Sequence, residues 1–214
     1  MSFPIIVIGA GGHAAVVADA LLASGQVVLG FTDASSSRRG QQLCGLPVLG
    51  DDAVLAEYDP GTVVLANGLG SVGNEATQVR QRVQQSLEGQ GWHFCPVVHP
   101  SAVISRFACL GESVQVMAGC VIQAGAAVGA GCIINTASVV EHNAVIDAWS
   151  HVAPRAVVCG DVRVGAGSHV GAGATVRHGV SLGARTLVGA GAVVVKDFSG
   201  SGVLVGIPAR QLER

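Results

Sequence analysis

One histidine has neighbours that could help it do chemistry. His142 lies between Glu141 and Asn143 in the stretch NTASVVEHNAVID. A free imidazole titrates near pH ~6.5, so at neutral pH it can accept a proton from a reacting group or bind a metal ion. Which of these it does, or whether it only packs, depends on the elements that hold it.

A second set of residues has the spacing of a phosphate-binding turn. Residues 9–14 read GAGGHA, which matches G-x-G-x-x-A, directly after a predicted strand and at the predicted start of a helix. Free amide groups at a helix N-terminus favour an anion. Asp33 ends the next predicted strand, where an acid commonly meets a ribose hydroxyl. These features predict a nucleotide site.

The first part of the chain is expected to be an α/β, Rossmann-like domain. A further strand is predicted over residues 62–66, and a helix follows the loop at Asn67–Gly68. Residues 1–92 therefore predict a truncated nucleotide domain with three or four parallel strands. The second half that a dinucleotide needs is missing, because a different pattern begins there. We expect a mononucleotide or a nucleotide-sugar.

That pattern is a six-residue repeat. Every sixth residue from Val98 to Val194 is Val, Ile or Leu, and the residue two positions earlier is small or medium from Val114 onward. Glycine often follows the aliphatic residue, where we expect it to accept the backbone angles of a corner. A period of six predicts short strands wound into a left-handed parallel β-helix, with about 18 residues to a coil and no insertion loop. The β-helix is expected over residues 93–195, with a tail over 196–214.

The repeat assigns several side chains. Cys120 and Cys132 occupy the small inward position and are expected to pack rather than react. His142 falls outside the inward pair, so the coil displays it. Flat faces with so many apolar residues favour association, and β-helices of this type usually form homotrimers.

Composition excludes several partners. Lys and Arg number 12 against 14 Asp and Glu, so a net charge of -2 favours neither nucleic acid nor an anionic membrane. Residues 114–140 carry no charge, yet their strict spacing of six argues against a membrane helix. The six cysteines lack metal-finger spacing and suit reduced thiols, and the N-terminus lacks the basic region of a signal peptide. We expect a cytoplasmic protein.

Four motifs together resemble one family. They are GAGGHA, HPSA at residues 99–102, NTASVVEHN, and GIPAR at residues 206–210. The combination is similar to the sialic-acid O-acetyltransferase and nucleotide-aminosugar N-acetyltransferase family. This resemblance implies N-acetylation of a UDP- or GDP-linked 4-amino-4,6-dideoxysugar by acetyl-CoA. It also implies a homotrimer that binds acetyl-CoA between two β-helices.

The resemblance assigns roles within the β-helix. His142 matches the general base, Asn135 matches an asparagine near the amine, and the Gly160 amide matches the group that receives the thioester oxyanion. His151, Ala172 and Ala190 match contacts to acetyl-CoA. His169 and His178 match no assigned position, and we expect them to be solvated.

The resemblance also assigns the nucleotide site. Gly11, Gly12 and His13 match the phosphate and sugar loop, while Asp33 and Ala34 match contacts to the base and ribose. The sequence leaves the choice between UDP and GDP open, as well as the identity of the sugar.

Position 143 departs from the family pattern. An acid usually follows the catalytic histidine and makes it more basic, whereas this chain has Asn143. Either Glu141 substitutes for that acid or the base is weaker.

Three alternative functions stay open: O-acetylation of a sugar hydroxyl, a non-catalytic nucleotide-sugar sensor, and a zinc enzyme of the γ-type carbonic anhydrase kind. The last needs two ligands five residues apart, whereas His142 and His151 are nine apart, so no metal is expected.

Overall fold

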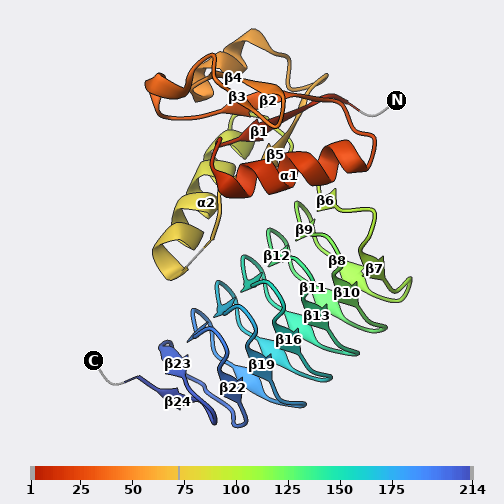
Figure 1. Cartoon of the computed structure of the whole chain (residues 1–214), viewed down its shortest axis with the longest axis vertical. Helices are drawn as coiled ribbons and strands as arrows, with labels where there is room; N and C mark the ends of the chain where they lie inside the picture. Colours follow the sequence, from red (N-terminus) through yellow and green to blue (C-terminus); the bar gives the residue numbers. More distant parts are fainter. Residues whose placement is uncertain (1–2, 72, 213–214) are drawn as a thin grey trace.

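The computed structural model describes residues 3–71 and 73–212. An α/β part packs along one side of a long β-helix (Figure 1). Its sheet has the order β3-β4-β2-β1-β5. Four strands are parallel, as expected, and the short β3 adds an antiparallel edge. The strands are β1 (Ile5–Ile8), β2 (Val28–Thr32), β3 (Gln42–Leu43), β4 (Leu46–Gly50) and β5 (Val64–Asn67).

Helices pack on this sheet and connect it to the β-helix. The α-helices are α1 (Gly12–Ala23) and α2 (Gly73–Glu88), and Ser36–Arg38 and Asp52–Glu57 form 3-10 turns. Strand β1 is buried along its whole length, as a central parallel strand requires. Helix α1 approaches the sheet closely, because a Cβ on Gly68 would lie 2.7 Å from the Cβ of Ala14. None of the described helices is long and apolar enough to cross a membrane.

The six-residue repeat forms the predicted β-helix. Each hexad contributes a two-residue strand that ends on its aliphatic residue, without interruption from Val97 to Val194. Val121 pairs with Val139, and Val139 with Val157, so one coil takes 18 residues. The strands are β6 (Val97–Val98), β7 (Val103–Ile104), β8 (Cys109–Leu110), β9 (Gln115–Val116), β10 (Val121–Ile122), β11 (Ala127–Val128), β12 (Ile133–Ile134), β13 (Val139–Val140), β14 (Val145–Ile146), β15 (His151–Val152), β16 (Val157–Val158), β17 (Arg163–Val164), β18 (His169–Val170), β19 (Thr175–Val176), β20 (Ser181–Leu182), β21 (Leu187–Val188), β22 (Val193–Val194), β23 (Val203–Val205) and β24 (Arg210–Gln211).

Three sheets form the sides of the coil. The domain-facing sheet holds β6, β9, β12, β15, β18 and β21 with β23 and β24 at its end. The valine sheet holds β7, β10, β13, β16, β19 and β22, and the third sheet holds β8, β11, β14, β17 and β20. The α/β part covers the domain-facing sheet, so both residues of β9, β12, β15 and β18 are buried there.

The coil interior follows the sequence prediction. The aliphatic hexad residues from Val116 to Val194 are buried, and Cys120 and Cys132 are fully buried in the small inward position. Burial raises the pKa of the Cys132 thiol to about 12, so it stays protonated and unreactive. The uncharged residues 114–140 form strands β9 to β13, not a helix.

The glycines after the aliphatic residues have a different role from the one expected. Gly129 and Gly165 do not adopt positive φ. A Cβ on either would lie 2.6 or 2.5 Å from a backbone nitrogen of the next coil, so glycine is needed for close stacking. The left-handed backbone falls elsewhere in the corner, at Asn143 (φ 57°) and Asp161 (φ 58°). Asn and Asp are the non-glycine residues that adopt it most readily.

Candidate active site

The glycine turn lies where the sequence predicted it. Strand β1 ends at Ile8, Gly11 is the N-cap of α1, and a Cβ on Gly11 or Gly12 would meet no atom within 4 Å. The open space in front of these amides can receive a phosphate. Asp33 follows β2 directly, and its Oδ2 accepts a hydrogen bond of 3.2 Å from the Ala10 N–H.

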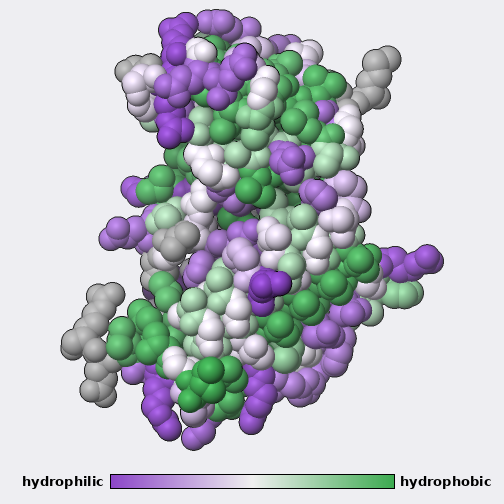
Figure 2. Space-filling model, viewed as in Figure 1, coloured by the Kyte–Doolittle hydropathy of each residue, from purple (hydrophilic) through white to green (hydrophobic). Residues whose placement is uncertain are grey.

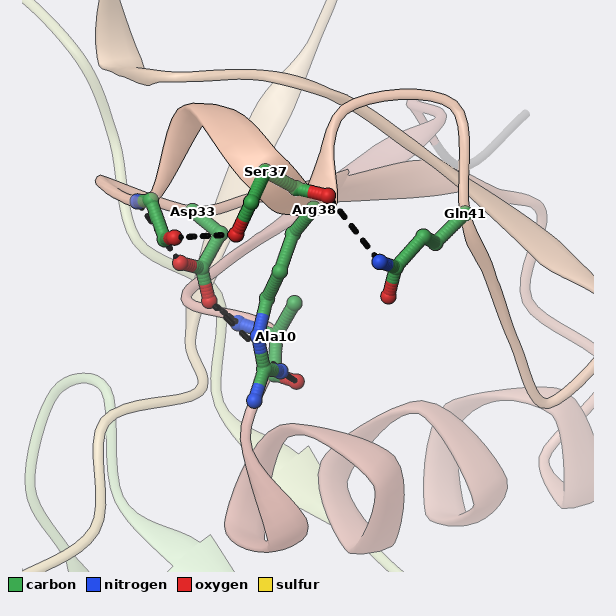
Figure 3. A network of polar contacts seen from close by, with 6 residues as sticks. Ala10, Asp33, Ser37, Arg38 and Gln41 are labelled. Carbon is green, nitrogen blue, oxygen red and sulfur yellow. Dashed lines mark hydrogen bonds and ion pairs between the residues drawn. The ribbon is translucent and has the colours of Figure 1, made fainter.

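An arginine that no sequence motif singles out lies beside this turn. Arg38 donates to the Ala10 carbonyl and lies 3.8 Å from Asp33 Oδ2 (Figure 3). Asp33 Oδ1 also accepts from the Ser35 N–H at 2.9 Å, and Ala34 is exposed on the same loop. The guanidinium therefore adds a positive charge to the predicted phosphate site. Nothing in the run SSSRR distinguishes Arg38 from Arg39, so only the fold could identify it.

His13 connects the glycine turn to the β-helix. Its Nε2 lies 2.8 Å from Gln115 Oε1, and the Gln115 amide donates to the Asn67 carbonyl at 2.5 Å. Burial lowers the pKa of His13 against the opposing effect of the Gln115 hydrogen bond. The ring is neutral at pH 7, so its Nε2–H donates to Gln115. This contact fixes the turn against the domain-facing sheet.

His151 is buried beneath the α/β part. Its Nδ1–H donates to the Ser71 carbonyl, and its Nε2 lies 3.1 Å from the Asn135 amide nitrogen, from which it accepts. Burial and the neighbouring His169 lower the pKa of His151 to about 3. His151 is therefore neutral, and both ring nitrogens are used in positioning Asn135 and the loop after β5.

His169 corrects one expectation. It was expected to be solvated, but it is buried and its ring packs edge-on against His151 at 4.8 Å between centroids. Burial lowers the pKa of His169 as well. His169 therefore belongs to the packing between the α/β part and the β-helix.

His142 has the opposite environment. It is exposed at the corner between the valine sheet and the third sheet, and its ring lies over Gly160 of the next coil. A Cβ on residue 160 would lie 2.5 Å from His142 Cε1 and Nε2. The Gly160 N–H donates to no backbone carbonyl among the described residues, whereas the neighbouring Asp161 N–H donates to the His142 carbonyl at 3.0 Å. A proton acceptor and an available amide donor thus lie together.

The flanking residues differ in their contacts with the ring. The Asn143 amide nitrogen lies 3.4 Å from His142 Nδ1. Glu141 forms no ion pair or side-chain hydrogen bond with any described residue. The structure therefore does not support Glu141 as the substitute for the missing acid.

Two further side chains join this corner. Asp161 Oδ2 lies 3.4 Å from His178 Nε2, and the rings of His142 and His178 are 6.0 Å apart. Ligand atoms of His142, Asp161 and His178 all lie within 4.8 Å of one another. His178 was expected to be only solvated. Recognising its place in this group requires knowing that residues 142, 160 and 178 stack on one corner. Two imidazoles and a carboxylate are also ligands that zinc accepts.

The remaining predicted residues lie at a different corner. Asn135, Ala172 and Ala190 all follow strands of the domain-facing sheet and precede strands of the valine sheet. Ala172 and Ala190 are exposed on adjacent coils, where the Gly191 N–H donates to the Ala172 carbonyl at 2.9 Å. Within one chain, the valine sheet separates these residues from His142 and Gly160.

Comparison with family models supports both parts of the architecture. Residues 4–87 match the PglD N-terminal domain, and residues 161–196 match the bacterial transferase hexapeptide (six repeats). A comparison with curated protein sequences finds no significant match.

Solved structures resemble the whole chain. The acetyltransferase domain of PglB from Neisseria gonorrhoeae, also solved with acetyl coenzyme A, is 33% identical with a TM-score of 0.90, covering 99% of this chain and 100% of that one. A mutant of perosamine N-acetyltransferase from Caulobacter crescentus, in complex with CoA and GDP-perosamine, is 36% identical with a TM-score of 0.90 and covers 100% of both chains.

A more distant structure agrees in fold. WeeI from Acinetobacter baumannii is 24% identical with a TM-score of 0.86, covering 99% of this chain and 100% of that one. The identity over the full length of the first two structures is sufficient to assign the family. The chain belongs to the sialic-acid O-acetyltransferase and nucleotide-aminosugar N-acetyltransferase family, which joins an N-terminal α/β domain to a left-handed β-helix.

Proposed function

We propose that the protein is an acetyl-CoA-dependent N-acetyltransferase acting on the amino group of a nucleotide-linked 4-amino-4,6-dideoxysugar. The observation that carries the proposal is the His142 ring over Gly160, with the Gly160 N–H available as a donor. The similarity to a perosamine N-acetyltransferase in complex with CoA and GDP-perosamine supports the same reaction class.

In the proposed mechanism, His142 accepts a proton while the sugar amine attacks the thioester carbonyl. The N–C bond forms, and the developing oxyanion accepts a hydrogen bond from the Gly160 N–H. The C–S bond then breaks, and its electron pair leaves on the CoA sulfur, which takes up the proton from His142. A positioned general base of this kind contributes roughly 10²–10⁴-fold to the rate.

Asn143 sets the tautomer of the base. With its amide nitrogen toward Nδ1, the ring carries its proton on Nε2, the atom that faces Gly160. Turning the amide by 180° presents Oδ1, which accepts from Nδ1–H and leaves Nε2 free to take the proton. We assign this second orientation to the active form, because the proton must arrive at the ring edge over Gly160.

The nucleotide is proposed to bind at the α/β part, over residues 1–92. Gly11 and Gly12 offer free amides to the diphosphate, with His13 beside the sugar. Asp33 and Ala34 are assigned to the base and ribose, and Arg38 adds charge near the phosphates. The β-helix over residues 93–195 would bind acetyl-CoA through Ala172 and Ala190. His151, being buried, would act through the Asn135 amide that it holds.

A homotrimer would bring the corner that holds His142 and Gly160 next to the corner that holds Asn135 and the proposed cofactor residues of another chain. The outward residues of the valine sheet are almost all apolar, and the same face shows a continuous hydrophobic band (Figure 2). If neighbouring chains pack along this sheet, His142 of one chain approaches Asn135 and the cofactor residues of the next. An apolar patch of this extent favours a protein interface. The proposal places the trimer in the cytosol, in keeping with six free cysteines.

The test is thioester consumption from acetyl-CoA with a panel of UDP- and GDP-linked 4-amino-4,6-dideoxysugars, with His142→Ala as the control. Turnover that requires both the amine and His142 supports the proposal and identifies the nucleotide. Acetylation of a hydroxyl-bearing sugar, with every amine inert, would instead favour O-acetylation, the alternative to which the neutral Asn143 lends weight.

A further inference from the structure

The neutral residue at position 143 leaves one requirement of the mechanism unmet. His142 becomes positively charged when it takes the proton, and the Asn143 amide beside it carries no charge. An amide can orient the ring, whereas a nearby carboxylate also favours its protonated form. The base therefore needs a negative charge from another residue.

Asp161 lies where such a charge is needed. Residues 18 apart stack on adjacent coils, so Asp161 occupies the same corner position as Asn143, one coil along. A carboxylate oxygen of Asp161 lies within 4.8 Å of a ring nitrogen of His142. The His142 ring also leans toward this coil, because it covers Gly160.

The carboxylate has a second imidazole beside it. His178 Nε2 lies 3.4 Å from Asp161 Oδ2, and Asp161 is half-exposed. The two histidines occupy the same corner position, one coil before and one coil after Gly160. Asp161 thus lies close to both rings, and His178 restrains its carboxylate from the far side.

The other charged side chains at this corner form no ion pair with any described residue. Glu141 and Arg177 precede the two histidines, and neither forms an ion pair in the described chain. Arg106 lies two coils before His142, and Lys196 lies one coil after His178. Asp161 is therefore the acid that the fold brings to the ring.

We propose that Asp161 is the positioning residue for His142, and that its carboxylate stabilises the imidazolium in place of an acid at position 143. The proposal rests on the proposed function, because the imidazolium forms during acetyl transfer. The negative charge remains in the site but is supplied by the neighbouring coil.

Asp161→Asn is the direct test, since the two side chains have the same shape and both tolerate the left-handed backbone of φ 58°. We expect kcat/KM at pH 7 to fall about ten-fold. Without the carboxylate the protonated ring is less favoured, so the acid limb of the kcat/KM profile should move to lower pH. The KM for acetyl-CoA and the melting temperature should stay unchanged.

A charge swap separates this role from a structural one. In the double variant Asn143→Asp with Asp161→Asn, the carboxylate returns beside His142 Nδ1, and we expect kcat/KM within about three-fold of wild type. Glu141→Gln is the matched control for loss of an acid at the same corner, and its pH profile should match that of wild type.

Several results would overturn the proposal. An Asp161→Asn variant with an unchanged rate and acid limb would do so, as would an acid limb that moves only in Glu141→Gln. Loss of wild-type activity on chelation, restored by zinc, would show that His142, Asp161 and His178 are metal ligands instead.

A second readout keeps the inference separate from the proposed function. If wild-type protein acetylates no aminosugar, the function fails, yet the ring of His142 can still be titrated by NMR without substrate. The inference then requires the midpoint of that titration to be lower in Asp161→Asn than in wild type, and equal midpoints would refute it.

Discussion

Two groups of histidines in this chain have opposite environments. His13, His151 and His169 lie under the α/β part, where burial lowers the pKa of each ring and keeps it neutral. His142 and His178 lie exposed at the far corner of the β-helix with a carboxylate between their coils. The first group is suited to holding two parts of the chain together, and the second to exchanging protons.

The difference shows how one repeat gives unlike sites. His151 and His169 begin strands of the domain-facing sheet, whereas His142 and His178 lie in turns, two residues after an aliphatic hexad residue. The α/β part covers the domain-facing sheet, so both residues of β15 and β18 are buried. Position in the hexad and tertiary packing together decide which histidines can react.

The largest change is expected when the valine sheet receives a charge. Val157→Asp places a carboxylate in the middle of the apolar face, and burying it at an interface would be costly. In the proposed trimer each site takes one corner from its neighbour, so we predict dissociation to monomers and at least a ~100-fold loss of activity. Light scattering and turnover measure the two effects.

A matched valine controls for the charge itself. Val145 holds the same strand position on the third sheet, so Val145→Asp should leave the proposed trimer and most of the activity intact. If Val145→Asp dissociates the protein and Val157→Asp does not, the third sheet is the interface.

The next largest effect is expected at the exposed corner. In Gly160→Ala the new Cβ falls 2.5 Å from His142 Cε1 and Nε2, so the ring must move. The ring is the far end of an exposed side chain and can swing aside, so we predict a loss of roughly 10–100-fold in kcat with little change in the melting temperature. Adding Gly160→Ala to His142→Ala should cause no further loss of activity, since the clash is gone. A Gly160→Ala variant with wild-type kcat would show that the ring need not lie over residue 160 during the reaction.

The buried histidines are expected to make the stability of the fold depend on pH. His151 titrates near 6.5 when unfolded and has a pKa of about 3 when folded, so the unfolded state binds the extra proton between these values. Stability should be complete above pH 6.5 and fall by roughly 1.4 kcal/mol per pH unit for this histidine as the pH drops toward 3. Urea unfolding at pH 7.5 and 5 measures the slope.

Variants locate the source of that slope. His151→Gln can keep a donor to Ser71 and an acceptor for Asn135 but cannot titrate, so it should flatten the curve. His93→Gln, at an exposed ring, should leave it unchanged. A slope that persists in His151→Gln at full size would assign it to other groups.

The smallest effect is expected at Glu141. Its carboxylate forms no ion pair or side-chain hydrogen bond with any residue in the described part of the chain, so Glu141→Gln should change kcat/KM by less than about two-fold. A larger loss would indicate that Glu141 reaches His142 in the bound enzyme.

Much of the fold was predictable because the repeat constrains it. A strict period of six with alternating large and small inward residues permits one coil geometry, and every strand from β6 to β22 falls on that frame. The glycine turn was equally clear, since Gly11, Gly12 and Asp33 follow strands β1 and β2 as predicted. Local pattern decides these elements.

The site was predictable only for residues that are neighbours in the sequence or one coil apart in the repeat. His142, Gly160 and Asn143 share one corner, as their spacing indicates. The burial of His151 and His169 could not be read from the repeat, because it depends on which side the α/β part covers. Arg38, Asp161 and His178 were missed because their importance arises from contacts across coils or loops.

The most direct measurement compares His142→Gln with His151→Gln in single-turnover acetyl transfer at saturating acetyl-CoA. We predict that His142→Gln loses roughly 10²–10⁴-fold in rate, as expected for a lost general base. His151→Gln should stay within about ten-fold of wild type, because its neutral ring only holds Asn135 and Ser71 in place. A His142→Gln variant with near wild-type transfer, beside an inactive and folded His151→Gln, would contradict it and move the chemistry to the buried group.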